Sequence, residues 1–134
     1  MTIRELNLGH AAAVEAFRRM VFNVMARNCD DHTKNFSFLM RKGATWEFSP
    51  AYDVTFSHNP NGEWTNQHLM SLNGKYKNFN SDDFFKIADR FGIGGASLII
   101  GDVKNALKEW NSFAQMAGLK KEETEWIRGL HFNW

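Results

Sequence analysis

Eight consecutive residues, Asn28 to Asn35, have the side chains best suited to chemistry in this 134-residue sequence. Their order is Asn-Cys-Asp-Asp-His-Thr-Lys-Asn, and seven of the eight are polar or ionisable. Such a segment gains nothing from burial in an apolar core, because its polar groups would lose their contacts with water. We therefore expect a surface loop, which is where residues held by rigid neighbouring elements often carry function.

Asp30 and Asn35 have a spacing that occurs in the catalytic loop of protein kinases. There the Asp accepts or orients the proton of the substrate hydroxyl, and an Asn five residues later binds Mg²⁺. Hard oxygen atoms are the ligands that Mg²⁺ prefers, and a carboxylate can act on a hydroxyl proton. An Asp-x4-Asn pair also arises by accident, in which case both residues belong to a turn.

Asp53 strengthens this interpretation because of its place in the chain. It lies in Ser-Pro-Ala-Tyr-Asp-Val, directly after two short apolar runs, 36–40 and 45–48, which predict a β-hairpin. The order helix, Asp–Asn loop, hairpin and Asp would bring three oxygen ligands to the two ends of one β-ribbon. The alternative for Asp53 is a solvated carboxylate.

The helices that must position this loop follow from apolar spacing. Residues 10–27 predict a helix, since Val14, Phe17, Val21 and Val24 recur at three- and four-residue steps. Asn28–Asp31 is poor helix material and good turn material, so the helix should stop there.

Three further helices are expected towards the C-terminus. Ser81–Asp83 is a plausible N-cap for a helix through Arg90, and Gly92–Gly95 should interrupt the chain. A long helix should run from Ile99 to Ala117 and stop at Gly118, and a last one should span 121–130. Residues 54–80 have no clear assignment. The prediction for 1–134 is a single, mainly α domain with one small β-hairpin beside the functional loop.

Composition excludes several classes of protein. Hydrophobic residues make up 43% and aromatic residues 14%, which is enough for an independent core. A net charge of +1 argues against direct nucleic-acid binding, and no apolar run is long enough for a membrane span. The single Cys29 excludes an internal disulfide and a multi-cysteine zinc site, so a cytoplasmic location is expected.

The loop and its surroundings resemble a known family. Asn28–Asn35, followed by Phe36-Ser37-Phe38 and by Ser49–Val54, is similar to the C-terminal lobe of HipA-like serine/threonine protein kinases, the toxins of bacterial HipBA-type toxin–antitoxin modules. Ser71–Lys75 and Phe79–Phe84 also resemble that family. The resemblance covers roughly residues 15–95, and it implies a kinase C-lobe-like α+β fold.

The resemblance implies a role for each loop residue. Asp30 would be the catalytic Asp, and Asn35 and Asp53 would be ligands of Mg²⁺, with ATP as the second cofactor. Lys34 and His32 match family loop positions with less definite roles, and both are candidates for cofactor binding. Lys34 could contact a phosphate or neutralise the acidic loop. His32 could stabilise the loop by hydrogen bonding, or join a transition-metal site with Asp30 and Asp53.

The sequence departs from a complete kinase of this type. It contains no glycine-rich phosphate loop between strands and no strand carrying a phosphate-pairing Lys. We therefore expect the C-terminal lobe alone, without the N-terminal nucleotide-binding lobe, and inactive until that lobe is supplied in cis or in trans. The expected partners are that lobe, a HipB-like antitoxin, a protein substrate and a second copy of the chain. The alternative is a non-catalytic helical interaction module derived from a kinase lobe.

Other polar residues have simpler expected roles. Asp31 should be a helix cap or a solvated carboxylate, Cys29 a partly buried structural thiol, and Lys75 a surface charge. The sequence identifies no partner for three histidines: His58, His68 and His131.

Overall fold

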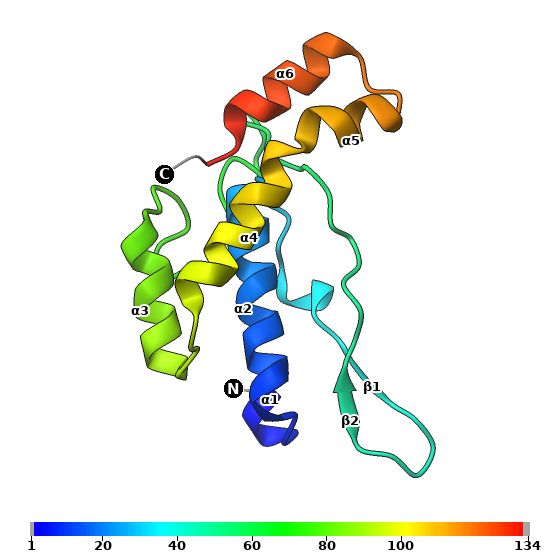
Figure 1. Ribbon diagram of the computed structural model, residues 1–134, viewed down its shortest axis with the longest axis vertical. Helices are drawn as coiled ribbons and strands as arrows, with labels where there is room; N and C mark the ends of the chain where they lie inside the picture. The colour runs from blue at the N-terminus through cyan, green and yellow to red at the C-terminus, as the bar shows by residue number, and fades with distance from the viewer. Residues whose placement is uncertain (1, 133–134) are drawn as a thin grey trace.

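The computed structural model describes residues 2–132 and shows a helical protein with one two-stranded hairpin (Figure 1). This confirms the mainly α prediction. The elements are α1 (Thr2–Glu5), α2 (Gly9–Met25), a 3-10 turn η1 (Thr33–Asn35), β1 (Phe38–Met40), β2 (Trp46–Phe48), α3 (Ser81–Phe91), α4 (Ala96–Lys108), α5 (Trp110–Met116) and α6 (Lys121–Leu130). No helix in this part of the chain is apolar and long enough to span a bilayer.

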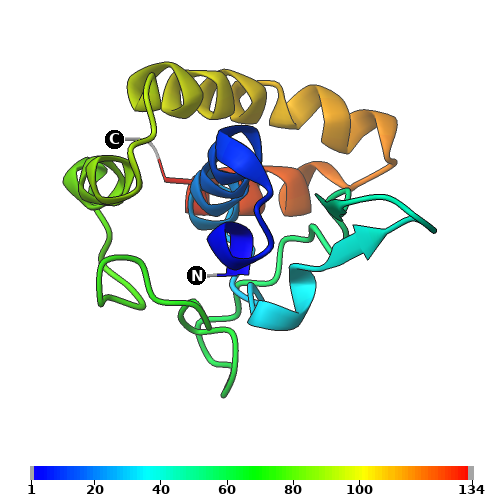
Figure 2. The same cartoon turned by 90° about the horizontal axis from the view of Figure 1, so that it is seen from below.

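Helix α2 is the central element of the fold. Seen nearly end-on, it is surrounded by α3, α4, the hairpin and the irregular segment that follows the hairpin (Figure 2). Its predicted apolar stripe is confirmed, because Phe17, Val21 and Val24 are buried in the main core cluster. The helix ends at Met25, two residues before the predicted end, and Arg27 then adopts a left-handed conformation with φ of 61°. This turn directs the chain into the polar loop.

The predicted hairpin is present and is anchored to α2. Strands β1 and β2 are antiparallel, with Phe38 opposite Phe48. The guanidinium of Arg19 on α2 lies 4.1 Å from the centre of the Phe48 ring and donates a hydrogen bond of 2.7 Å to the Ser49 carbonyl. A cation over an aromatic face is attractive, so these contacts fix the hairpin root beside the loop.

Helix α3 begins at Ser81, and its N-cap lies one residue before the predicted cap segment Ser81–Asp83. Asn80 is the N-cap, and its side chain accepts a hydrogen bond from the Asp83 amide while Asp83 accepts one from the Asn80 amide. The buried Asp83 carboxylate also pairs with Lys75 at 2.8 Å, so Lys75 is more than the surface charge that we expected. These contacts attach the turn at 72–75, which is closed by an isolated β-bridge, to α3.

The predicted long helix from Ile99 to Ala117 is wrong in one respect, because it is divided at Glu109. Helices α4 and α5 meet there with a change of direction (Figure 1). After α5 the chain reverses so that α6 packs along it (Figure 1), and the Trp110 indole donates a hydrogen bond of 2.9 Å to the Thr124 carbonyl. The stop at Gly118 is confirmed by its left-handed φ of 77°.

Candidate metal and catalytic site

Asn28 connects the start of the polar loop to the chain beyond the hairpin. Its buried side chain donates hydrogen bonds to the Asn23 side chain at 3.2 Å and to the Asp53 carbonyl at 3.3 Å. Its side-chain oxygen Oδ1 accepts a hydrogen bond of 3.3 Å from the Ser57 hydroxyl. Asn28 therefore holds Asp53 and the loop at a fixed separation. Apart from the family resemblance of the loop, no pattern in the amino-acid sequence indicates this role for Asn28.

The Asp30 backbone is held on both sides. Its amide donates to the Ser57 hydroxyl at 2.9 Å, and its carbonyl accepts a hydrogen bond of 2.9 Å from the Asn35 side chain. Asn35 is the last residue of η1. This single 3-10 turn brings its side chain back to the Asp30 backbone, five residues earlier in the chain. The Asp30 carboxylate is consequently aimed out of the loop and is partly open to solvent.

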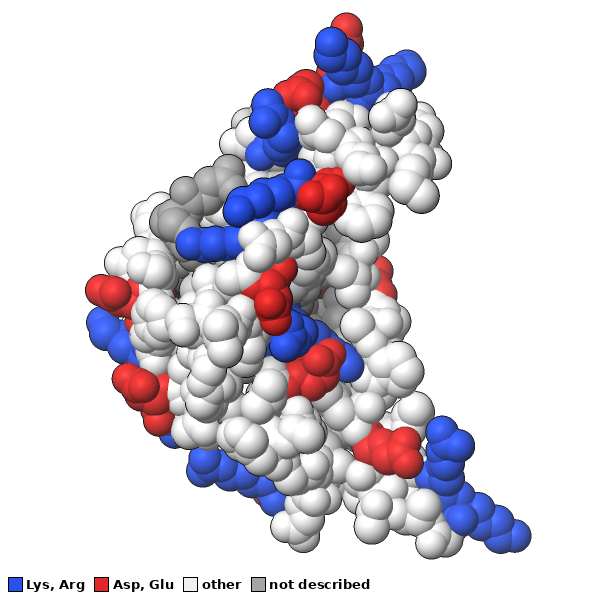
Figure 3. Space-filling model, viewed as in Figure 1, with Lys and Arg blue, Asp and Glu red and all other residues white. Residues whose placement is uncertain are grey.

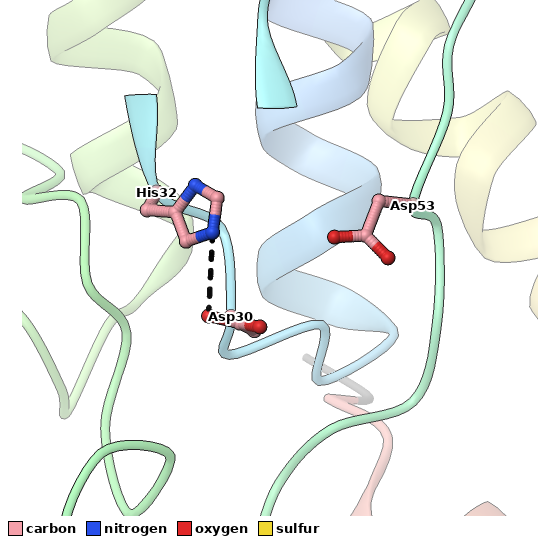
Figure 4. Close-up of side chains that lie close together, drawn as sticks. All are labelled: Asp30, His32 and Asp53. Carbon is pink, nitrogen blue, oxygen red and sulfur yellow. Dashed lines mark ion pairs between the residues drawn. The ribbon is translucent and has the colours of Figure 1, made fainter. Parts of the chain in front are cut away.

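Three side chains converge at this point: Asp30, His32 and Asp53 (Figure 4). One potential ligand atom from each lies within 4.8 Å of those of the other two. His32 Nε2 is 3.8 Å from Asp30 Oδ1. Asp53 comes from the far side of the hairpin and has a left-handed φ of 53°. The predicted convergence of the loop with the carboxylate after the hairpin is therefore seen for Asp30 and Asp53.

This group of side chains has the composition of a divalent-metal site. Among residues 2–132, neither the Asp30 carboxylate nor the Asp53 carboxylate accepts a hydrogen bond, so their oxygen atoms have no competing donors. Two carboxylates that face each other repel, and a cation between them removes that cost. Hard oxygen atoms of this kind are the ligands that Mg²⁺ prefers, while the side-chain contact of the predicted ligand Asn35 is the hydrogen bond from its nitrogen to the Asp30 carbonyl.

Comparison with known proteins assigns the chain to a family. The family model described as "HipA-like C-terminal domain" matches residues 1–125. The chain belongs to this family. The match includes the loop, the hairpin and Asp53, and it ends half-way along α6.

A curated relative of this HipA-like domain is a Haemophilus influenzae protein that carries the name "Putative kinase". The two sequences are 25% identical over 118 residues, which is 76% of this chain and 34% of the relative. The HipA-like domain thus spans about a third of the length of that protein.

Asp31 differs from the expected solvated or capping carboxylate, and this expectation was wrong. Only 5% of its surface is exposed. Its Oδ2 lies 2.9 Å from His68 Nδ1, and its Oδ1 accepts hydrogen bonds from the Leu69 and Met70 amides at 2.8 and 3.1 Å. The adjacent aspartates thus have opposite surroundings, and Asp31 fastens the irregular segment to the loop of the HipA-like domain.

Cys29 is a structural thiol, as expected, but it is fully buried and not partly buried. His58 Nδ1 lies 3.6 Å from its sulfur, a neighbour that the sequence did not reveal. Burial raises the pKa of the Cys29 thiol to about 11, against a smaller opposing effect of the Arg27 charge. Burial also lowers the pKa of His58, with Arg27 contributing. A protonated thiol beside a neutral imidazole is a poor nucleophile.

Lys34 and a cavity complete the surroundings of the loop. The Lys34 side chain is exposed and has no acidic partner within the described chain, while its carbonyl accepts the Tyr52 hydroxyl. A mainly apolar cavity of about 320 Å³ lies between α2, α4 and the chain at 51–54, and Asn28, Asn35 and Tyr52 contribute to its wall.

Proposed function

We propose that this chain is the catalytic lobe of a HipA-like serine/threonine protein kinase, which transfers the γ-phosphoryl group of ATP to a protein hydroxyl with Mg²⁺. The observation that carries the proposal is the convergence of the Asp30 and Asp53 carboxylates across the loop and the hairpin. Family membership and the name of the Haemophilus influenzae relative support it.

Each residue then has a defined task. Asp30 accepts or orients the proton of the attacking hydroxyl, because its carboxylate is aimed outward by backbone bonds to Ser57 and Asn35. Asn35 and Asp53 hold the metal. Bound Mg²⁺ supplies positive charge to the phosphate oxygens of ATP. Lys34 and His32 would contact the nucleotide phosphates, Lys34 through its exposed ammonium group.

The proposal includes partners. The described residues supply metal ligands and a carboxylate for the hydroxyl, whereas phosphoryl transfer also depends on groups that cover and position the phosphates. We propose that an N-terminal lobe supplies them, in the same polypeptide or as a separate chain. A protein substrate and a HipB-like antitoxin follow from the same family relationship.

A chimera provides the test. This chain would replace the matching region of the Haemophilus influenzae relative, and transfer of labelled phosphate from ATP to serine-containing protein would be measured beside the unaltered relative. We expect activity that Asp30→Ala and Asp53→Ala lower by about 10²–10⁴-fold. Asn35→Ala should also impair it strongly. Asp89→Ala, an exposed acid on α3, is the matched control and should leave activity unchanged.

Two results would contradict the proposal. A chimera as active with Asp30→Ala as without it would mean that the catalytic loop is assigned wrongly. Tight ATP binding and turnover by residues 1–134 alone would mean that no second lobe is required.

A non-catalytic interaction module remains the second candidate, and the exposed apolar side chains favour it. Leu98 and Met116 are 73% and 81% exposed, on α4 and α5. Such a module would bind its partner equally well with Asp30→Ala and Asp53→Ala, which separates it from the kinase lobe.

A further inference from the structure

The His32 imidazole has ring nitrogens that no hydrogen bond of the described chain uses. Nδ1 is buried and has no partner. Nε2 points towards Asp30 (Figure 4), and its separation of 3.8 Å from Oδ1 is too long for a hydrogen bond. The hydrogen-bonding role that the sequence allowed for His32 is therefore absent from residues 2–132. A ring held in this way, with Nε2 directed at two carboxylates, has the arrangement of a metal ligand.

Comparison with Asp31 shows that the unused ligand atoms at this site belong to Asp30, His32 and Asp53. Asp31 uses both carboxylate oxygens, for a buried contact with His68 and partly buried contacts with the Leu69 and Met70 amides. The carboxylates of Asp30 and Asp53 accept no hydrogen bond within the described chain and face His32. One nitrogen and two carboxylate groups are thus available at one point.

We propose that Asp30, His32 and Asp53 form a site for a first-row transition ion, with Zn²⁺ or Co²⁺ preferred over Mg²⁺. Imidazole is a good ligand for these ions, whereas Mg²⁺ prefers an all-oxygen set. Three protein ligands with water in the fourth position is a common arrangement for zinc.

The three ligand atoms need to move only a little closer together to bind one ion. With bonds of 2.0–2.2 Å, tetrahedral ligands lie roughly 3.3–3.6 Å apart. The His32–Asp30 pair is already at 3.8 Å, and the three ligand atoms lie within 4.8 Å. The side chains of Asp30 and His32 are partly exposed, so rotation about their side-chain bonds can provide the difference.

The consequence for activity rests on the proposed kinase function. An ion held by Asp30 takes the carboxylate that would act on the substrate hydroxyl. Zn²⁺ is therefore an inhibitor of this site, in contrast to Mg²⁺ held by Asn35 and Asp53. The binding itself does not depend on kinase activity and can be measured on residues 1–134.

The first measurement is calorimetric titration of residues 1–134 with Zn²⁺ in the presence of excess Mg²⁺. We expect one Zn²⁺ per chain, and His32→Gln should weaken binding by about 10-fold or more, as loss of a group that supports a metal does elsewhere. His10→Gln, an exposed histidine on α2, is the matched control and should bind like the wild type. Circular dichroism confirms that the variants are folded.

The second measurement is proton NMR of the Co²⁺-loaded chain. Ligation through Nε2 leaves a proton on the buried Nδ1, so one strongly shifted N–H signal is expected, and His32→Gln should remove it. Equal Zn²⁺ binding by wild type and His32→Gln would overturn the proposal, as would complete displacement of Zn²⁺ by Mg²⁺. Either result would leave the proposed function standing, whereas an inactive chimera with intact Zn²⁺ binding would refute the proposed function alone.

Discussion

Asp30 and Asp31 are adjacent carboxylates with opposite surroundings, and the difference comes from which way the loop backbone turns each side chain. Asp31 points inward and is enclosed by the segment at 68–70. Asp30 points outward, because Ser57 and Asn35 occupy its backbone groups and leave its carboxylate free. One residue therefore stabilises the loop, and its neighbour is available for metal or substrate.

Replacement of Asp31 should destabilise the protein strongly. Asp31→Ala leaves the buried His68 ring and two partly buried backbone amides without their acceptor, and we expect a loss of about 3 kcal/mol in the free energy of unfolding. Urea denaturation followed by circular dichroism would measure it. Asp89→Ala removes an exposed carboxylate and should change stability by less than about 0.5 kcal/mol. Equal stabilities for the two variants would show that the buried contacts do not operate in solution.

Cys29 should make stability fall in alkaline solution. Burial raises the pKa of the folded thiol from 9.0 to about 11. Between these values the unfolded chain releases the thiol proton while the folded chain keeps it, so the unfolded state binds fewer protons and stability decreases as pH rises. Below pH 9.0 this contribution is fully present. Cys29→Ala should flatten the decrease in urea unfolding measured across this range. An unchanged slope would mean that the thiol is not buried.

At the scale of elements, the start of α3 distinguishes two candidate caps. Asn80→Ala removes the side chain that accepts the Asp83 amide and should cost about 1 kcal/mol of unfolding free energy. Ser81→Ala alters the first helical residue, which makes no side-chain cap bond in the structure, and should cost less than about 0.5 kcal/mol. Both changes in unfolding free energy can be obtained from the midpoints of urea denaturation curves, provided that the dependence of the free energy on urea concentration is the same for each variant. A larger loss of stability for Ser81→Ala than for Asn80→Ala would indicate that Ser81 is the cap, as the sequence predicted.

The elements that sequence predicted well are those specified by local pattern. Helix α2, the hairpin and α6 each have apolar periodicity and a terminating signal within their own residues. The division at Glu109 was missed because the apolar spacing continues across it without a glycine or proline. The Asp31–His68 contact was missed for a different reason. It joins residues 37 positions apart through a segment without regular structure, where periodicity carries no information.

In the candidate site, too, local pattern predicted some features and missed others. The order of loop, hairpin and carboxylate was enough to predict that Asp30 and Asp53 approach each other, because the hairpin is a local element. The supporting bonds of Asn28 and Ser57 depend on where an irregular chain returns, and no spacing rule indicates them.

At the scale of the molecule, apolar side chains remain uncovered on the hairpin. Leu39, Met40 and Trp46, which we term the hairpin patch, are all exposed. Charges of both signs are interspersed over the face seen in Figure 3 and form no extended field of one sign. An apolar patch rimmed by mixed charge is typical of a surface that docks a protein, and the proposed N-terminal lobe would be such a partner.

The hairpin patch should cause association of the isolated chain. We expect dimers whose proportion rises with concentration in light scattering, since uncovered apolar area favours contact between copies. Replacing Leu39 and Met40 by Lys should abolish the dimer. Leu98→Lys, at a more exposed position on α4, is the control and should leave the dimer unchanged. A strictly monomeric wild-type chain would argue against a docking role for this surface.

The contact between the root of the loop and the C-terminal segment has a consequence for synthesis on the ribosome. The Arg27 guanidinium lies 3.9 Å from the centre of the Phe132 ring and donates to the Leu130 carbonyl, 103 residues later. The Phe132 amide donates to the Met25 carbonyl, which closes the same junction. A nascent chain that has made α2, the loop and the hairpin still lacks these contacts. Although domains tend to fold from the N-terminus during translation, the loop can reach its final anchorage only after α6 has been released.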